Sequence, residues 1–195
     1  VSGRHNIEAF VSDGVRAGKR MNLGGGNIDV NIIDEMAENY NLSIGEVTAE
    51  RIKNTVGSLF PGDDKVMMVD GRDATTGTPA TVTVRTTNIY EVLILYVDKI
   101  IEYVSLIISK LPSEVSSSII HSGVFLSGGL CKMDGIAEYF SEKLGITINT
   151  FDEPQLAAVI GAGTIISREH FKNKAAPQNR VGLGIKTLEL MAPGE

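Results

Sequence analysis

The sequence contains one cysteine and no tryptophan among its 195 residues. A single thiol cannot form a disulfide within the chain or a cysteine-cluster metal site, which favours a reducing compartment, and we expect the cytoplasm. No run of residues approaches the roughly 18 apolar residues of a membrane span. The chain opens without an initiator methionine and without the basic-then-apolar order of a signal peptide, so we interpret it as a fragment or an excised domain.

Positive charge is also scarce, because 18 Lys and Arg residues stand against 24 Asp and Glu residues and leave a net charge of −6. A protein that binds nucleic acid through its phosphates needs a clustered basic surface, so we expect no nucleic-acid partner. Hydrophobic residues make up 43% of the chain and charged residues 22%, the balance of an ordinary soluble domain. The length indicates one domain or two small lobes.

Hydrophobic periodicity predicts alternating strands and helices, which is the order of an α/β fold. The predicted strands cover residues 4–11, 15–22, 65–69, 80–85, 123–126 and 146–150. The predicted helices begin near residues 27, 46, 88, 133 and 154 and end near residues 40, 57, 110, 144 and 168. The sequence Ser12-Asp13-Gly14 suits the tight turn of a hairpin between the first two strands.

Side-chain chemistry predicts further detail at the ends of these elements. The Asn88 amide is expected to cap the helix that begins there. Residues 123–126 are continuously apolar, which is typical of a strand buried on both faces. The serines of residues 113–118 match no nucleophile motif, and we interpret this stretch as a polar connection. Residues 171–195 lack periodicity and are expected to form a loosely ordered tail.

Two glycine-rich places would let the backbone approach a ligand. Gly128 and Gly129 follow a predicted strand, at the end where open α/β sheets bind their ligands. A tight turn without a ligand is an equal alternative there. The triplet at residues 24–26 matches no complete dinucleotide or phosphate-loop fingerprint, so direct ligand contact is the less favoured interpretation of it.

Charged and thiol side chains offer three further candidates. Glu50 and Lys53 share one face of a predicted helix, either as a solvated ion pair or as the polar wall of a cleft, and their spacing leaves both open. The three histidines are far apart and lack the spacing of metal ligands, so we expect no metal site within this chain. Cys131 follows the glycine pair, and a buried, inert thiol is the preferred interpretation.

Four segments together resemble the second half of a bacterial actin of the MreB type. They are residues 24–29, 43–53, 57–62 and 126–130. The most specific is the run Ile-Gly-Glu-x-Thr-Ala-Glu-x-Ile-Lys at residues 44–53. The resemblance covers about residues 1–170 and extends to MamK, the magnetosome-organising relative. It implies an α/β fold of the actin-like (ribonuclease-H-like) kind, with residues 1–25 and 121–170 as the base layer and residues 26–120 as an inserted smaller α+β subdomain.

The resemblance also implies that ATP or ADP binds with Mg²⁺ between two domains, and that subunits stack into protofilaments. The implied contacts with adenosine are Glu50, Lys53 and Asn54 from the insert, and Gly128, Gly129, Leu130 and Met133 from the base. A purine and a ribose need an apolar surface with a few placed polar groups, which this set supplies. Leu130 stands where the family has a third loop glycine, and we expect it to narrow or alter the pocket.

The phosphate loops, the magnesium ligands and the carboxylate that positions water are implied to lie upstream of Val1. We therefore expect this chain alone to have no catalytic residue and no ATPase activity, and to be monomeric or weakly associated. The longer protein would hydrolyse ATP and form filaments for cell shape or organelle positioning, and peripheral contacts with a membrane or a membrane protein stay open for it.

Three alternatives remain beside this interpretation. A DnaK-type chaperone ATPase shares the two-lobed fold but should continue into a β-rich peptide-binding domain. A sugar kinase should carry a sugar-binding carboxylate in its other half. A non-catalytic actin-like scaffold would have kept the fold and lost the nucleotide, and Leu130 is the one feature that points to it.

Overall fold

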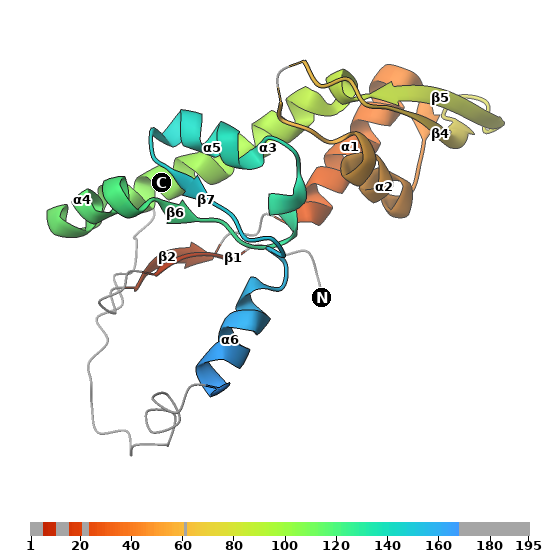
Figure 1. The fold of residues 1–195 in the computed structure, drawn as a ribbon. Coiled ribbons are helices and arrows are strands. Elements are labelled where there is room, and N and C mark those ends of the chain that lie inside the picture. Colours follow the sequence, from red (N-terminus) through yellow and green to blue (C-terminus); the bar gives the residue numbers. More distant parts are fainter. Residues whose placement is uncertain (1–5, 11–15, 21–23, 61, 168–195) are drawn as a thin grey trace.

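A computed structural model describes residues 6–10, 16–20, 24–60 and 62–167, with backbone only for the first two ranges (Figure 1). The elements in chain order are β1 (Asn6–Phe10), β2 (Arg16–Arg20), α1 (Gly25–Tyr40), β3 (Leu42–Ser43), α2 (Glu46–Val56), β4 (Val66–Asp73), β5 (Pro79–Arg85), α3 (Thr86–Ser109), α4 (Ser113–Ser122), β6 (Val124–Phe125), the 3-10 turn η1 (Gly129–Lys132), α5 (Ile136–Leu144), β7 (Ile148–Asn149) and α6 (Ala157–Ser167). This order confirms the predicted mixture of strands and helices. The hairpin turn at 12–14 and the tail at 171–195 lie outside the described residues.

The described strands form three small sheets. β1 pairs antiparallel with β2, which confirms the predicted hairpin, and β6 pairs parallel with β7. In the third sheet β4 lies between β3 and β5, both antiparallel to it. β4 runs further than predicted, through Asp73, because Gly71 lets β3 approach closely. A Cβ at Gly71 would lie 2.7 Å from the carbonyl oxygen of Ser43.

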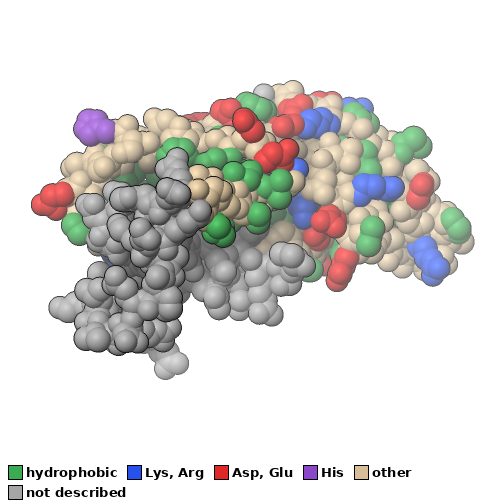
Figure 2. Space-filling view, turned by 60° about the horizontal axis from the view of Figure 1, so that its bottom comes forward, with side chains coloured by type: hydrophobic (Ala, Val, Ile, Leu, Met, Phe, Trp, Pro, Cys, Tyr) green, Lys and Arg blue, Asp and Glu red, His purple; other side chains and the backbone are tan. Residues whose placement is uncertain are grey.

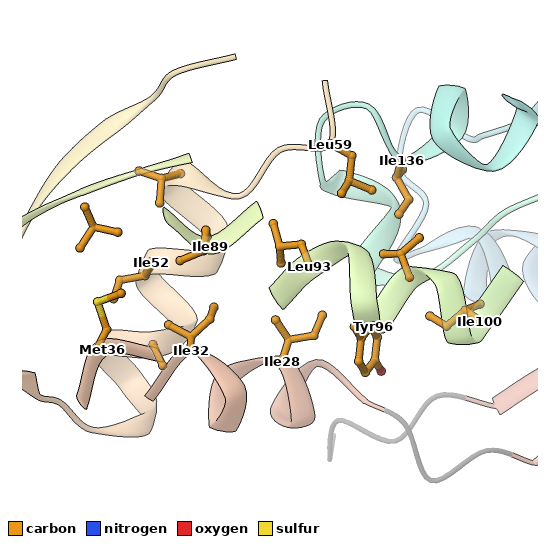
Figure 3. Close-up of a cluster of buried hydrophobic side chains, with 14 of the residues drawn as sticks. Ile28, Ile32, Met36, Ile52, Leu59, Ile89, Leu93, Tyr96, Ile100 and Ile136 are labelled. Carbon is orange, nitrogen blue, oxygen red and sulfur yellow. The ribbon is translucent and has the colours of Figure 1, made fainter. Parts of the chain in front are cut away.

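One hydrophobic core follows the length of helix α3. In Figure 3 the side chains of α3 lie between those of α1, α2 and α5. The labelled members of the core are Ile28, Ile32, Met36, Ile52, Leu59, Ile89, Leu93, Tyr96, Ile100 and Ile136. The apolar positions predicted for the helix that ends near residue 110 lie in or against this core. Burial of this many apolar side chains is the main source of stability for such a domain. The core therefore sets the relative positions of α1, α2 and α5.

Two predictions are wrong for identifiable reasons, one of a helix start and one of a connection. Helix α3 begins before Asn88, whose side-chain oxygen accepts a hydrogen bond of 2.7 Å from the Arg85 N–H. Asn88 thus closes the first turn from the third helical position rather than as the N-cap. The stretch 113–118, predicted as a connection, belongs to helix α4. The Ser117 hydroxyl donates to the Ser113 carbonyl at 2.9 Å, a local bond that lets serine sit inside a helix.

Strand β6 lies where it was predicted, but the expected burial of both its faces is wrong. Phe125 is 62% exposed and stacks on Phe151 with ring centroids 5.6 Å apart. Val159 and Ile166 of helix α6 are each 70% exposed as well. Hydrophobic side chains gather in the middle of the face shown in Figure 2. β6 and α6 thus expose apolar side chains that strands and helices of an α/β fold usually bury.

A buried hydroxyl joins the end of α2 to the start of α3. The Thr86 hydroxyl donates to the Val56 carbonyl at 2.8 Å and accepts a bond of 3.1 Å from the Lys65 N–H. We expect Thr86→Val to lower the free energy of unfolding by about 2 kcal/mol, because the buried Val56 carbonyl and the partly buried Lys65 N–H lose their partner. Thr87→Val, at the exposed neighbouring position, should change it by less than about 0.5 kcal/mol. Equal urea midpoints for the two variants would contradict this.

The tip between β4 and β5 is ordered by the Asp73 carboxylate. It accepts bonds from the Thr76 N–H at 2.7 Å, the Thr75 N–H at 2.9 Å and the Asn41 amide at 2.9 Å. The Thr76 N–H is the largest of the causes that hold the pKa of Asp73 below its usual value. Hydrogen bonds to a carboxylate favour its charged form.

Acid should loosen this tip. Because the folded pKa of Asp73 is lowered, its carboxylate stabilises the tip above the unfolded pKa, and this stabilisation is lost as the pH falls through the folded pKa. We expect amide exchange at Thr75 and Thr76 to lose protection in that range, and Asp73→Asn to lose it at neutral pH. Asp70→Asn, on the exposed sheet face, is the control. Protection that survives in Asp73→Asn would contradict the account.

Candidate functional site

The Lys53 side chain is held by helix α1. Its Nζ donates to Asp29 Oδ1 at 2.7 Å and to the Gly25 carbonyl oxygen at 3.3 Å. The side chains of Lys53 and Asp29 are 11% and 12% exposed. Glu50 lies on α2, as Lys53 does, and its side chain is exposed. None of the ion pairs among the described residues joins Glu50 to Lys53. A solvated Glu50–Lys53 pair, one of the two predicted options, is therefore not what the structure contains.

Packing of α1 on α2 places this ion pair. Ala49, Ile52 and Val56 of α2 recur at three- and four-residue spacing and have no exposed surface. Lys53 follows Ile52 and reaches across to the first turn of α1. The sequence prediction missed Asp29. Its position could have indicated a role, because Asp29 directly follows Ile28 and places a charge beside the apolar stripe of α1.

The glycine triplet serves this arrangement. Gly24 precedes α1 in extended conformation, and its N–H donates to Asn27 Oδ1 at 2.7 Å. A Cβ at Gly25 would lie 3.2 Å from the Lys53 ammonium nitrogen, which is a tight contact, whereas a Cβ at Gly26 would meet no atom within 4 Å. The described contacts thus give Gly24 and Gly25 a local role in starting the helix and admitting Lys53.

The second group of predicted residues forms a turn between β6 and α5. Gly128 has φ +109°, a conformation that favours glycine, and its N–H donates to the Pro154 carbonyl at 2.8 Å. Gly129 is exposed, and a Cβ there would meet no atom within 4 Å. Leu130 and Met133 pack against the hydrophobic core. Leu130 does not have positive φ, so the turn accepts a leucine without backbone strain.

A close backbone crossing ties the end of α2 to this turn. The Leu59 N–H donates to the Asp134 carbonyl at 2.8 Å. Gly135 has φ +79°, and a Cβ there would lie 2.6 Å from the Phe60 nitrogen, so no larger residue fits. The segment that follows α2 and the turn that precedes α5 are thus in direct contact, while Asn54 is exposed in the last turn of α2.

The remaining features of the described residues do not form a second candidate site with comparable polar contacts. Burial raises the pKa of the Cys131 thiol to about 11, so it is protonated at neutral pH, which supports the inert interpretation. A shallow hollow of about 560 Å³ lies away from the predicted residues and is lined by Ser43, Ile44, Gly45, Thr48, Asp70, Gly71 and Arg72. Within the described ranges, no three His, Cys, Asp or Glu side chains gather as a metal site requires. No helix of that part of the chain is long and apolar enough to cross a bilayer.

Comparison with known proteins gives consistent matches. A family model described as MreB/Mbl protein matches residues 2–174. The chain is 30% identical over 165 residues to the cell shape-determining protein Mbl of Bacillus cereus, which covers 84% of this chain and 50% of that protein. The chain thus spans about half the length of the curated relatives it matches.

Solved structures show the same fold. The crystal structure of MreB5 of Spiroplasma citri bound to ADP superposes with a TM-score of 0.78 at 24% identity, over 88% of this chain and 55% of that one. A MamK double helical filament superposes with a TM-score of 0.61 at 19% identity, over 80% of this chain and 47% of that one. These likenesses confirm the predicted fold class, an α/β fold of the actin-like kind.

The Lys53–Asp29 pair should be important for stability. We expect Lys53→Met to lower the free energy of unfolding by about 3 kcal/mol, because it leaves the Asp29 carboxylate nearly buried without its partner. Arg85→Met, which breaks the half-exposed pair with Asp64, should cost less than about 1 kcal/mol. Chemical denaturation of both variants measures the difference. Similar losses in the two variants would show that the buried pair is no stronger than a surface contact.

Proposed function

The chain belongs to the MreB/Mbl family, and from this we propose that it is the nucleotide-binding C-terminal part of an actin-like cytoskeletal ATPase that forms protofilaments. The observation that carries the proposal is the family match over residues 2–174, which includes both groups of predicted site residues. The relative in Bacillus cereus is named for determining cell shape, and MamK was solved as a filament. Cytoplasmic filaments for cell shape or organelle positioning are the role we propose.

Within this proposal, one wall of the nucleotide site comes from each part of the chain. Residues 26–120 are the insert and supply Glu50, Lys53 and Asn54, while residues 1–25 and 121–170 are the base layer and supply Gly128, Gly129, Leu130 and Met133. The crossing at Gly135, the open space above Gly129 and the ADP bound to MreB5 of Spiroplasma citri support this assignment. None of the residues assigned to this site lines the shallow hollow.

Phosphate and Mg²⁺ would be held mainly by chain upstream of Val1. Among the described residues no three metal-ligating side chains gather, so these residues do not fit a Mg²⁺ ion by themselves. What these residues supply is binding of the nucleoside and exclusion of water around it. We propose that this chain alone is inactive and monomeric, and that the longer protein assembles head to tail.

The family match favours this function over two of the alternatives. A DnaK-type chaperone and a sugar kinase share the two-lobed fold, but the matched model is that of the MreB/Mbl proteins. The non-catalytic scaffold was suggested by Leu130. Since Leu130 packs against the core without backbone strain, its presence does not require a lost nucleotide site.

Nucleotide affinity of the longer protein tests the proposal. Gly129→Val should fold normally, because its side chain enters open space, and should weaken ADP binding by more than about 1 kcal/mol if that space holds the nucleotide. Gly26→Val, also in open space, is the matched control and should bind like the parent.

Calorimetric titration with ADP, with thermal melting as the check of folding, measures both variants. Equal affinities for the parent and Gly129→Val would reject the proposed pocket. The present chain alone is the negative control for ATP turnover. Clear magnesium-dependent hydrolysis by it would contradict the proposal that phosphate and Mg²⁺ are held by another part of the longer protein.

A further inference from the structure

We propose that Asp29 is a positioning residue for the nucleoside part of the nucleotide. It holds the Lys53 ammonium group in place and neutralises its charge, so that Lys53 offers one N–H to an uncharged acceptor, a ribose hydroxyl or a purine ring nitrogen, rather than to a phosphate. This inference rests on the proposed function, which already assigns Lys53 to the nucleoside, and adds to it the role of Asp29 and the kind of acceptor that Lys53 meets.

The hydrogen-bond capacity of Lys53 is the first argument. An ammonium group has three N–H donors and no acceptor. Two of them are directed to Asp29 Oδ1 at 2.7 Å and to the Gly25 carbonyl at 3.3 Å. Since the Lys53 side chain is 11% exposed, these bonds and the surrounding packing fix the nitrogen. One donor remains for a ligand, in a direction set by α1 rather than by a freely moving side chain.

The opposite charges of Lys53 and Asp29 also favour an uncharged acceptor. Lysines that bind phosphate act as point charges. Here the Asp29 carboxylate lies in direct contact with the ammonium group, and its own side chain is only 12% exposed. The Asp29 charge offsets about half of the attraction that Lys53 would exert on an approaching phosphate, because the carboxylate lies farther from that phosphate than the ammonium nitrogen does. An uncharged hydroxyl or ring nitrogen meets no such repulsion and still gains the hydrogen bond.

The absence of a side chain at Gly25 also supports the inference, because it leaves room beside α1 for the Lys53 ammonium group. A Cβ at residue 25 would press on Nζ from 3.2 Å, while a Cβ at residue 26 would press on nothing. A purely adhesive ion pair between two helices would tolerate a shift of a few tenths of an ångström, since both side chains can follow. A positioned donor would not, because hydrogen bonds weaken with distance and angle.

A double-mutant cycle in the longer protein tests the inference, with ADP as the probe. Lys53→Met should weaken ADP binding about tenfold, and Asp29→Asn should weaken it about as much in the presence of Lys53. In the Lys53→Met background, Asp29→Asn should change ADP affinity by less than about twofold, since Asp29 acts through Lys53. Affinities are measured well below the melting temperature of each variant.

Inorganic pyrophosphate is the second probe, because it carries the phosphates without the nucleoside. Both single variants should bind pyrophosphate within about twofold of the parent, whereas a merely structural loss would weaken both ligands together. Pyrophosphate affinity that falls in parallel with ADP affinity would overturn the inference.

Gly25→Ala and Gly26→Ala form a pair that changes no charge and improves helix propensity at both positions. Gly25→Ala should weaken ADP binding by displacing the Lys53 ammonium group, and Gly26→Ala should not. Equal ADP affinity of these two variants counts against a positioned donor. This pair keeps the inference open to refutation if either charge variant fails to fold.

The outcomes separate this inference from the proposed function. Loss of ADP affinity in Lys53→Met but not in Asp29→Asn rejects the role of Asp29 and leaves the nucleotide site standing. A loss in Asp29→Asn that persists without Lys53 also rejects it. Unchanged ADP affinity in Lys53→Met rejects the inference together with the placement of Lys53 in the site, while the effect of Gly129→Val still decides whether the turn at residue 129 contacts the nucleotide.

Discussion

The arrangement of this domain depends on a backbone crossing at which no side chain fits. Gly135 passes so close to the Phe60 nitrogen that a Cβ would lie 2.6 Å from it, and the Leu59 N–H bonds to the Asp134 carbonyl beside it. The crossing joins the segment that follows α2 to the turn that precedes α5. Helix α2 and this turn carry the two groups of residues that we assign to the nucleotide, so a main-chain contact acts together with the hydrophobic core in setting their relative position.

A second constraint works on the other side of α2. Apolar packing alone would let two helices slide by small amounts, because it has little directionality. The Lys53–Asp29 pair adds a directed contact between α1 and α2 in surroundings that exclude most water. Breaking it leaves a nearly buried charge, which is a large penalty in a domain of ordinary stability. The pair that fixes these two helices also contains Lys53, the residue to which we assign a hydrogen bond to the ligand.

Sequence patterns predicted most elements of this fold because their apolar spacing is strong, as in the stripe of Ala49, Ile52 and Val56 on α2. They failed where the outcome depended on groups distant in the chain. The spacing on α2 left open whether Lys53 pairs with Glu50 or whether both face a cleft, whereas the structure pairs Lys53 with Asp29, which only tertiary packing brings near. The run around Phe125 reads as a buried strand, but burial depends on what covers it, and spacing carries no such information.

The central claim is that both groups of residues face one nucleotide. Hydrogen–deuterium exchange of the longer protein with and without ADP tests it most directly. We expect ADP to slow exchange in the last turns of α2, around residues 50–54, and in the turn of residues 128–133 at the same ADP concentration, and to leave the tip around Asp73 unaffected. Slower exchange in only one of the two segments, or in neither, would contradict the claim.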